Sequence, residues 1–303
     1  MMRPKRLCLY HYPCADGVFA AWGFELAAPG ETVFKAHSTH PDKRLAVADL
    51  PDADELVLVD YCGPDVAWLS ECLARYDHVL LVDHHKTASD MLEALPLANQ
   101  GKPLANQGKL YVIMNDGFSA CNLVRRFLEL PLGQERAHLW DYIQDNDLYT
   151  HVMPGSKALT LGLKARGIEY DIEKNPALWS QLGALRMGEL LSEGFKLFEQ
   201  QAALMSHYMS MVVMKRLGGL DVPSCVIRAN QHGIINDLGH SMAKAFRIGV
   251  GAVCIEDEEA GYARVSLRSL SHVNCLPLAA EYGGGGHAQS AGFSMPLRQW
   301  RAL

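Results

Sequence analysis

Asp83, His84 and His85 stand together in the sequence and could bind a metal ion. They directly follow residues 78–82, a short apolar run with β-branched members that is typical of a buried strand. The carboxyl end of a strand is where open α/β sheets bind their ligands. The carboxylate offers oxygen and each neutral imidazole offers nitrogen, which suits a hard or borderline metal. Read alone, such a triplet is more often a polar strand end that caps the next helix.

Two other predicted strands end in turns of the same kind. Residues 7–10 are followed by His11 and Asp16, and residues 55–60 end in Asp60. Because the carboxyl ends of parallel strands meet at one edge of a sheet, we expect all three turns to lie close together. A single Asp in such a place is more often a helix cap or a turn residue. The three turns together predict a ligand-binding site at this edge of the sheet.

This combination of residues predicts a two-metal site for phosphoryl chemistry. A shared carboxylate can hold two divalent ions ~3.5–4 Å apart, and such a pair activates water for in-line displacement at phosphorus. Asp16 and Asp60 are the expected shared ligands. His11, His84 and one carboxylate of the acidic segment 141–147 are the other expected ligands. Mixed His and carboxylate ligands favour two Mn²⁺ ions, with Mg²⁺, Co²⁺ and Fe²⁺ as competitors.

A run of four Gly, residues 283–286, forms a second candidate site together with His287. Gly permits positive φ and leaves backbone N–H groups exposed, so such a run can hold a phosphate. Arg268 lies on a predicted strand earlier in the same region, and a guanidinium suits bidentate phosphate contact. A Gly run by itself is weak evidence for a phosphate site, since it is also typical of a flexible loop.

The order of the elements predicts an α/β fold. Strands alternate with helices in the N-terminal half, which indicates a doubly wound parallel sheet. Residues 1–176 are the predicted catalytic domain, residues 177–216 a linker helix, and residues 217–303 a smaller α/β domain with a Gly-rich substrate loop. The expected strands are residues 7–10, 32–36, 55–60, 78–82, 110–114, 224–228, 249–255 and 262–269, and the expected helices are residues 18–27, 64–76, 119–130, 135–146, 236–246 and 276–282.

The composition excludes several classes of protein. With 303 residues, 49% hydrophobic and 20% charged, the chain can bury the cores of two domains. No apolar run is long enough to span a bilayer or to form a signal-peptide core, so we expect a cytoplasmic protein that does not bind membranes. The eight Cys include no C-x-x-C pair, which argues against a zinc ribbon. A net charge of −6 argues against binding of long duplex nucleic acid but not of a small phosphorylated substrate.

A short sequence duplication lies between the predicted strands 78–82 and 110–114. Residues 96–102 and 103–109 are the same seven letters, PLANQGK. Two copies of this length are too short for a solenoid, so we expect a lengthened surface loop, which costs little stability. A part in substrate binding is the alternative.

The motifs and their order resemble the DHH phosphoesterase family with its DHH-associated C-terminal domain. The resemblance depends on the Asp83-His84-His85 triplet, the strand end at Asp60, the His11 turn and the stretch GGGGHAQSAGF, and it spans residues 10–295. Members of this family are Mn²⁺-dependent phosphodiesterases and phosphatases. The resemblance implies that the N-terminal part is the DHH catalytic domain and that residues 217–303 bind substrate.

The resemblance also implies a role for each matching position. The implied metal ligands are His11 for the first ion, Asp16 for the second, Asp60 as the bridge and His84 to complete the second site. His85 would contact the scissile phosphate or orient a ligand. Asp83 would be a ligand or would orient a metal-bound His, which usually needs such support.

The remaining implied residues lie further along the chain. Asp145 is the implied ligand from the fourth motif, with Asp147 and Asp141 as alternatives. In the C-terminal domain, the residues implied to hold the remote phosphate or base of the substrate are Arg268, Gly285, Gly286 and His287.

The sequence departs from the family at Cys14, where many members have Asp. A thiolate is a softer ligand, which could bind zinc or iron more tightly than manganese, or Cys14 does not ligate at all. The function implied is metal-dependent hydrolysis of short oligonucleotides or dinucleotides. The alternatives are a phosphomonoesterase on pAp-like nucleotides, a polyphosphatase, and a nucleotide-binding sensor with a degenerate metal site. The sequence leaves the oligomeric state open, a homo-oligomer included.

Overall fold

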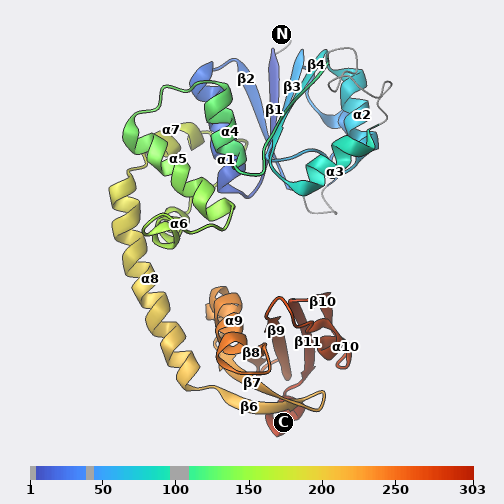
Figure 1. The fold of residues 1–303 in the computed structure, drawn as a ribbon, viewed down its shortest axis with the longest axis vertical. Coiled ribbons are helices and arrows are strands. Elements are labelled where there is room, and N and C mark those ends of the chain that lie inside the picture. Colours follow the sequence, from blue (N-terminus) through green and yellow to red (C-terminus); the bar gives the residue numbers. More distant parts are fainter. Residues whose placement is uncertain (1–4, 39–43, 96–108) are drawn as a thin grey trace. The chain divides into compact units, whose positions relative to one another are not determined.

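A computed structural model describes residues 5–38, 44–95 and 109–303 of the chain. The chain divides into two compact units, Met1–Leu197 and Phe198–Leu303, and each is described by itself (Figure 1). Apart from Lys109, the duplicated segment lies outside the described residues, and the surface loop expected there stays a prediction.

The N-terminal unit is built on a five-stranded sheet in which every strand pair is parallel. Its central strands are apolar and rich in Val and Leu because both of their faces are covered. In order across the sheet, the strands are β2 (Thr32–His37), β1 (Arg6–His11), β3 (Glu55–Val59), β4 (His78–Asp83) and β5 (Leu110–Met114).

Helices pack against both faces of this sheet (Figure 1). Alternate residues of each strand point to opposite faces, so Leu7 and Leu9 join one buried core while Cys8 and Tyr10 join the other. The Cys8 face is covered by α1 (Ala15–Ala27), α4 (Ala120–Phe127) and α5 (Gln134–Asp147). The Leu7 face is covered by η2 (Val47–Asp49), α2 (Val66–Arg75) and α3 (Lys86–Ala94).

The connections place a topological switch point between β1 and β3. The chain leaves β1 through α1 to reach β2 on one side, and leaves β3 through α2 to reach β4 on the other. The two connecting helices therefore lie on opposite faces, and the loops after β1 and β3 diverge from a crevice at the carboxyl edge. Crevices at such points are the usual ligand sites of open α/β sheets.

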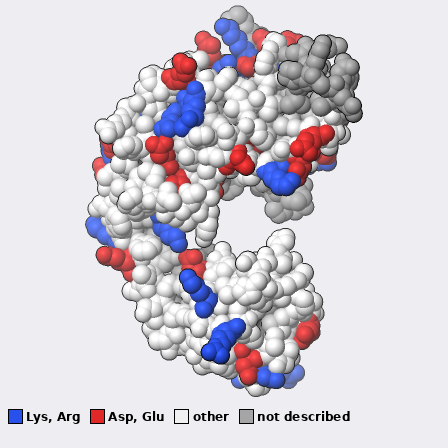
Figure 2. Space-filling model, viewed as in Figure 1, with Lys and Arg blue, Asp and Glu red and all other residues white. Residues whose placement is uncertain are grey.

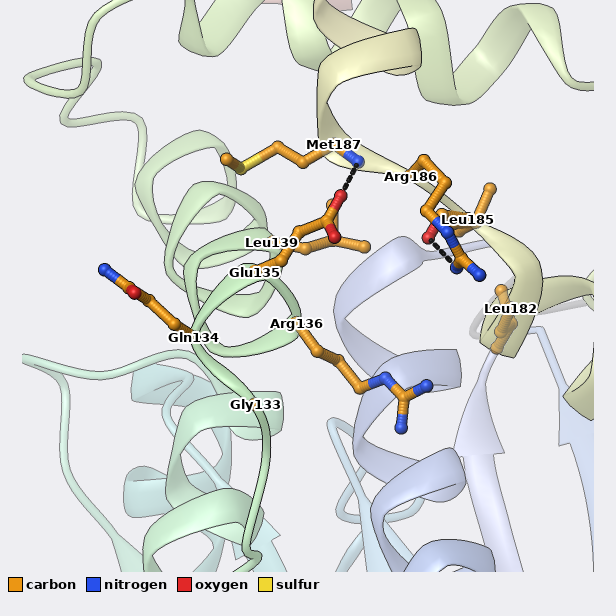
Figure 3. Close-up of a pocket in the computed structure, with 9 residues that line it drawn as sticks. All are labelled: Gly133, Gln134, Glu135, Arg136, Leu139, Leu182, Leu185, Arg186 and Met187. Carbon is orange, nitrogen blue, oxygen red and sulfur yellow. Dashed lines mark hydrogen bonds between the residues drawn. The ribbon is translucent and has the colours of Figure 1, made fainter.

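The linker predicted over residues 177–216 is not one helix. It comprises α7 (Leu178–Ala184), α8 (Met187–Ser210) and the start of β6 at Val213, and α6 (Ser156–Ala165) precedes it without having been predicted. Leu178 and Leu182 are buried in the N-terminal core, which holds α7 against that unit. Glu135 accepts a hydrogen bond from the Met187 N–H (3.0 Å), so a new helix begins there (Figure 3). The domain boundaries themselves stay a prediction.

The C-terminal unit is built on a six-stranded mixed sheet. Only β7 and β8 pair in parallel, and α9 (Ile235–Ala245) packs against β8 and β9. The opposite face packs against α10 (Leu276–Ala280) and α11 (Leu297–Ala302). In order across the sheet, the strands are β10 (Gly285–His287), β11 (Ser290–Pro296), β9 (Tyr262–Ser269), β8 (Val250–Asp257), β7 (Leu220–Ile227) and β6 (Val213–Leu217).

The predicted Gly-rich loop is a turn followed by a short edge strand. Gly283 has φ 73°, and the next residues lead into β10, which pairs with β11. Gly is required at Gly284 because a Cβ there would lie 2.1 Å from the carbonyl oxygen of Gly292. The strand β10 has a neighbour on one side only, so the backbone groups of its outer side face no other strand of this sheet.

The architecture confirms the predicted fold class, a doubly wound parallel α/β unit followed by a smaller α/β unit. None of the described helices is long and apolar enough to cross a membrane. On the face of the molecule drawn in Figure 2, acidic and basic side chains lie in small scattered groups among other residues. That pattern agrees with the slightly acidic net charge of −6.

Candidate metal centre

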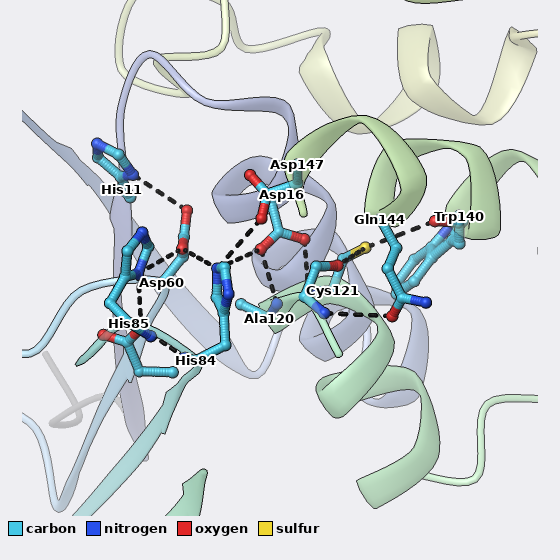
Figure 4. Close-up of polar contacts among 12 residues, drawn as sticks. His11, Asp16, Asp60, His84, His85, Ala120, Cys121, Trp140, Gln144 and Asp147 are labelled. Atoms are coloured by element: carbon cyan, nitrogen blue, oxygen red, sulfur yellow. Dashed lines mark hydrogen bonds and ion pairs between the residues drawn. The ribbon is translucent and has the colours of Figure 1, made fainter. Parts of the chain in front are cut away.

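The three strand-end turns converge on one group of polar side chains (Figure 4). His11 ends β1, Asp60 follows β3, and His84 and His85 follow β4, while Asp16 comes from the first turn of α1. His11 Nδ1 lies 3.0 Å from Asp60 Oδ2, and His84 Nε2 lies 3.4 Å from Asp60 Oδ1. The convergence predicted from parallel strand ends is thus present in the structure.

Within the described residues, three sets of side chains offer ligand atoms that all lie within 4.8 Å of one another. Asp60 belongs to two of the sets and His84 to two, so the sets are continuous with one another. The three sets are His11, Cys14 and Asp60; Asp60, Asp83, His84 and His85; and Asp16, His84 and Asp147.

Several atoms in this array are buried without a hydrogen-bond partner. They are Asp60 Oδ1, His84 Nε2 and Asp147 Oδ2. His84 Nε2 lies 3.2–3.7 Å from carboxylate oxygens of Asp147, Asp60 and Asp16, but forms a hydrogen bond with none of them. Buried polar atoms are nearly always paired, because an unpaired one costs about 1–3 kcal/mol. Oxygen and nitrogen atoms left in this way fit a site for divalent cations.

Asp60 is held in an unusual backbone conformation at the end of β3. Its φ is 55°, in the left-handed region, which Asp adopts more readily than most residues. Its backbone N–H donates to the carbonyl of Val82 in the neighbouring strand (2.9 Å), which fixes the turn. The carboxylate is buried at 2% exposure and directed between His11 and the His84–His85 pair (Figure 4).

The first turn of α1 approaches β1 closely enough to require Gly. A Cβ at Gly17 would lie 2.5 Å from the carbonyl oxygen of His11. This contact brings the turn that carries Cys14 and Asp16 alongside His11. The Gly of the His11…Asp16-Gly17 motif is therefore explained by close packing.

Asp16 joins the metal centre to the N-terminus of α4. Its Oδ2 accepts from the Ala120 N–H (2.7 Å) and its Oδ1 from the Cys121 N–H (2.9 Å). These are two of the backbone donors that a helix start leaves unpaired, and the helix dipole there favours a negative charge. Asp16 thus has a structural partner in addition to the place beside His84 that the sequence predicted.

Asp83 orients the two His side chains. Its Oδ1 accepts from the backbone N–H groups of His84 (2.7 Å) and His85 (3.0 Å) and lies 2.8 Å from His85 Nδ1. A carboxylate bound in this way favours the His85 tautomer with its proton on Nδ1. The prediction that Asp83 either ligates or orients therefore has a structural basis for the orienting role.

The charges of the centre shift the pKa values of its members. Burial, together with the negative charges of Asp60 and Asp147, raises the pKa of Asp16. Burial also opposes ionisation of Asp60, but the imidazoles of His11 and His84 outweigh it and hold the pKa of Asp60 low. Burial disfavours the charged form of His84, yet the carboxylates of Asp147, Asp60 and Asp16 raise its pKa to about 10.

These shifts predict how pH and metal affect stability. His84 has a folded-state pKa of about 10 against 6.5 as its ordinary value. Its contribution to the stability of the metal-free protein is therefore full below about pH 6.5 and is lost as pH rises towards 10. A cation competes with that proton, so stabilisation by Mn²⁺ should grow over the same range.

Thermal unfolding of metal-free protein between about pH 6.5 and pH 9.5 measures this effect. The midpoint of the wild type should fall with pH more steeply than that of His84→Gln, and the added stabilisation by Mn²⁺ should increase with pH only in the wild type. Equal slopes for the two proteins would contradict the raised pKa.

Cys14 lies at the N-cap of α1 and is partly buried. Burial and the charges of Asp60 and Asp16 raise the pKa of its thiol, against a hydrogen bond from the Gly17 N–H that lowers it. Of the eight Cys, all of which are described, Cys14 alone belongs to a set of ligand atoms.

In the segment of the fourth motif, the Asp that lies beside His84 is not the one that was expected to ligate. Asp147, not Asp145, lies beside His84. The Asp145 carboxylate instead accepts from the Thr150 hydroxyl (2.6 Å) and from the backbone N–H groups of Val152 (2.9 Å) and Met153 (3.2 Å). It therefore fixes the loop that follows α5.

The third alternative in this segment, Asp141, also has a structural partner. Its Oδ1 accepts from Arg125 Nη2 (2.8 Å) and lies 3.3 Å from Asn122 Nδ2. Both partners belong to α4, so Asp141 ties α5 to α4. Asp147 remains as the one member of the acidic segment whose carboxylate joins the described metal centre.

The predicted substrate-binding residues of the C-terminal unit lie on one sheet. Arg268, Ser290 and His287 are opposite one another across β9, β11 and β10, so their side chains share a face. Arg268 Nε donates to Asn236 Oδ1 of α9 (2.7 Å), and Nη1 donates to the Leu267 carbonyl (2.8 Å). His287 is exposed, as are Gly285 and Gly286 beside it in the edge strand β10. Their part in substrate binding stays a prediction.

A cavity of about 800 Å³ opens beside the metal centre in the N-terminal unit. Residues of the centre form part of its wall, among them Asp60 and His85. The rest includes His37, Arg44 and Tyr61, which the sequence had not indicated. The His37 and Tyr61 rings pack edge to face (4.9 Å between centroids), and Arg44 pairs with Asp65 (2.7 Å). His37 ends β2 and Tyr61 directly follows Asp60, whereas Arg44 comes from the segment between β2 and β3.

Comparison with known proteins identifies the C-terminal part. Residues 230–303 match the family model of the DHHA1 domain. The chain carries a DHHA1 domain. This match confirms the DHH-associated domain that the Gly-rich stretch had indicated. No curated protein matches the chain in sequence.

One of the matching solved structures, PggH, shares the fold over nearly the whole chain. A pGpG-specific phosphodiesterase, PggH from Vibrio cholerae, is 12% identical, with a TM-score of 0.53 over 98% of this chain and 95% of that one. RecJ from Thermus thermophilus, solved with Mn²⁺, is 14% identical, with a TM-score of 0.43 over 99% of this chain and 51% of that one. The likeness to PggH confirms the fold that the DHH resemblance predicted.

Proposed function

We propose that this chain is a metal-dependent phosphodiesterase that hydrolyses short oligonucleotides or dinucleotides. The observation that carries the proposal is the continuous array of ligand atoms at the switch point, with three of its buried atoms unpaired. An array that needs cations, placed where α/β sheets bind substrates, suits phosphoryl transfer better than structural metal binding, which uses closed sites.

The residues of the array would hold a pair of divalent cations. His11 and Asp60 serve one end, and Asp16, His84 and Asp147 serve the other. Bound cations of this kind lower the pKa of water and offset the charge that develops on phosphoryl oxygens. Asp60 lies between the two ends, which agrees with the bridging role implied by the DHH resemblance.

We infer that His85 contacts the phosphate. Its side chain is 46% exposed and lines the cavity, whereas His84 is largely buried within the array. The hydrogen bond with Asp83 raises the pKa of His85 against the effect of burial, so its charged form is favoured. A cationic donor fixed in this position offsets negative charge on a phosphoryl oxygen in the transition state.

Loss of Asp83 should therefore reduce turnover through His85. Asp83→Ala should lower kcat about 10–100-fold with a smaller change in KM, because the ring loses its orientation. Asp83→Asn keeps an oxygen for the two backbone N–H groups and should recover part of that loss. Steady-state kinetics of the three proteins, with the pH profile of kcat, tests the role. Equal kcat values for wild type and Asp83→Ala would contradict it.

The cavity beside the centre has the size expected for one nucleotide. Ligand pockets of about 300–1,000 Å³ are typical for small molecules, and this one measures about 800 Å³. Its aromatic side chains offer stacking surfaces and Arg44 offers a cation. We infer that the cavity holds one nucleoside of the substrate and that the DHHA1 residues Arg268 and His287 bind a more remote phosphate or base. The fold shared with PggH, whose name specifies pGpG, supports a dinucleotide as substrate.

A panel of phosphoesters tests the substrate class. Metal-stripped protein with added Mn²⁺ should release mononucleotides from pGpG and from a 5′-labelled RNA dinucleotide. It should act more slowly on a long single strand, pAp and polyphosphate. If the protein hydrolysed only pAp or only polyphosphate, that compound would be assigned as its substrate instead. Binding of nucleotides without turnover under Mn²⁺, Co²⁺ or Mg²⁺ would favour a sensor. A cytoplasmic location and the oligomeric state stay predictions.

A further inference from the structure

The two ends of the ligand array differ in their chemistry. One end offers nitrogen, sulfur and oxygen, from His11, Cys14 and Asp60. The other end offers nitrogen and oxygen alone, from Asp16, His84 and Asp147. Thiolate ligands select zinc, ferrous iron and other softer cations, whereas carboxylate-rich sites suit manganese and magnesium.

We propose that Cys14 is a metal ligand and that the array therefore binds two different cations, a zinc or ferrous ion at the Cys14 end and a manganese or magnesium ion at the Asp147 end. The inference rests on the metal centre of the proposed function and specifies how that centre is occupied. Asp60 takes part in the Cys14 end and lies beside His84 of the other, so the two cations share it.

The backbone at the start of α1 delivers Cys14 to this position. Its φ of −134° and ψ of 134° are extended, and its side chain makes no capping hydrogen bond to the helix. The close approach of Gly17 to His11 brings the turn against β1. Asp16, two residues later, is directed instead to α4 and His84. One short turn thus supplies a ligand atom to each end of the array.

A second observation is the buried, unpaired oxygen of Asp60, whose carboxylate lies between the two ends of the array. Asp60 is 2% exposed, and its Oδ1 has no hydrogen-bond partner. Its Oδ2 faces His11 of the Cys14 end (3.0 Å from Nδ1), whereas Oδ1 faces His84 and His85 (3.4 and 3.5 Å). The sulfur is therefore not alone, but lies beside a carboxylate oxygen and an imidazole at ligand spacing.

A neighbouring thiol provides the matched control. Cys62 is also partly buried and lines the cavity beside the centre, but it belongs to none of the ligand sets in the described residues. Its Sγ is 3.7 Å from the Gly63 carbonyl. Replacing Cys62 by Ser tests for general effects of losing a thiol near the site.

Cobalt spectroscopy tests the ligand directly. Metal-stripped full-length protein in a thiol-free reductant is titrated with Co²⁺. Wild type and Cys62→Ser should both develop a near-ultraviolet sulfur-to-cobalt charge-transfer band, and Cys14→Ser should bind Co²⁺ without that band. A band of undiminished intensity in Cys14→Ser would overturn the proposal.

Competition between metals tests the two-cation part. Wild type loaded from a mixture of Zn²⁺ with a large excess of Mn²⁺, then desalted, should retain both metals, since Zn²⁺ binds a given site more tightly than Mn²⁺. Cys14→Asp, which replaces the sulfur by oxygen and guards against misfolding of the Ser variant, should retain less zinc and more manganese than wild type. The same zinc content in both proteins would overturn it.

The two experiments separate this inference from the proposed function. A charge-transfer band in a protein that hydrolyses no phosphoester would support Cys14 as a ligand and contradict the proposed function. Hydrolysis by a protein that shows no band would support the proposed function and contradict Cys14 as a ligand.

Discussion

Replacing Asp60 by Asn is expected to lower metal-dependent hydrolysis by about 10³-fold or more. The reason is that Asp60 belongs to two of the three ligand sets and is almost fully buried between them. Asn keeps the size of the side chain but removes the charge and replaces one ligand oxygen by an N–H donor. Both cations should then bind weakly, so the stabilisation of the protein by Mn²⁺ should also disappear.

The control for this variant is Asp90→Asn. Asp90 lines the same cavity but is exposed and pairs with Lys86 (2.5 Å). An exposed ion pair of this kind contributes little to stability. Activity and the Mn²⁺-induced shift in unfolding temperature should both be close to those of wild type in Asp90→Asn. Full activity in Asp60→Asn would show that Asp60 takes no part in the reaction.

Asp147→Asn and Asp145→Asn are expected to have opposite effects. Asp147→Asn should lower activity about 10²–10³-fold, because it removes a ligand oxygen beside His84. Its effect on the stability of the metal-free protein should be small, because Asp147 disfavours ionisation of Asp16 but favours the charged form of His84. Asp145→Asn should reduce the free energy of unfolding by about 1–3 kcal/mol, because an amide N–H would face backbone donors now paired with its carboxylate.

Denaturant unfolding and turnover of the two variants measure this contrast. The folded fraction of Asp145→Asn should hydrolyse the substrate at a rate close to that of wild type. Loss of turnover in stably folded Asp145→Asn, with turnover retained in Asp147→Asn, would restore the assignment made from the sequence.

The choice between Asp145 and Asp147 shows why the sequence alone was insufficient there. Two residues along an α-helix are rotated by about 200°, so these side chains leave α5 on nearly opposite sides. Which one faces the centre depends on the rotation of α5 against α1 and α4. That rotation is set by buried Trp140 and Ile143, and no local pattern around the Asp residues reports it.

The strand-end residues could be predicted because parallel sheets place them by rule. A residue that follows an apolar strand lies at the carboxyl edge whatever its neighbours are, so His11, Asp60 and the His84–His85 pair were found from the strands alone. The cavity residue Arg44 follows no such rule. Its proximity to the centre depends on how the segment between β2 and β3 packs.

In the linker region, too, tertiary contacts decided a feature of the helices that the sequence pattern did not reveal. Helical periodicity was present throughout residues 177–216, but periodicity does not reveal a break that tertiary contacts create. The break before Met187 depends on Glu135, far earlier in the chain, which caps the new helix. Strand β6 was missed because it is a short edge strand whose Val213 and Met214 are both exposed.

The most direct test of the central claim is the turnover of a 5′-phosphorylated dinucleotide by metal-stripped protein before and after Mn²⁺ is added. The array of unpaired ligand atoms predicts no turnover without metal, rapid release of mononucleotides once Mn²⁺ is present, and no such recovery in Asp60→Asn. Equal turnover with and without Mn²⁺, or recovery by Mn²⁺ in Asp60→Asn, would contradict a metal-dependent phosphodiesterase at this site.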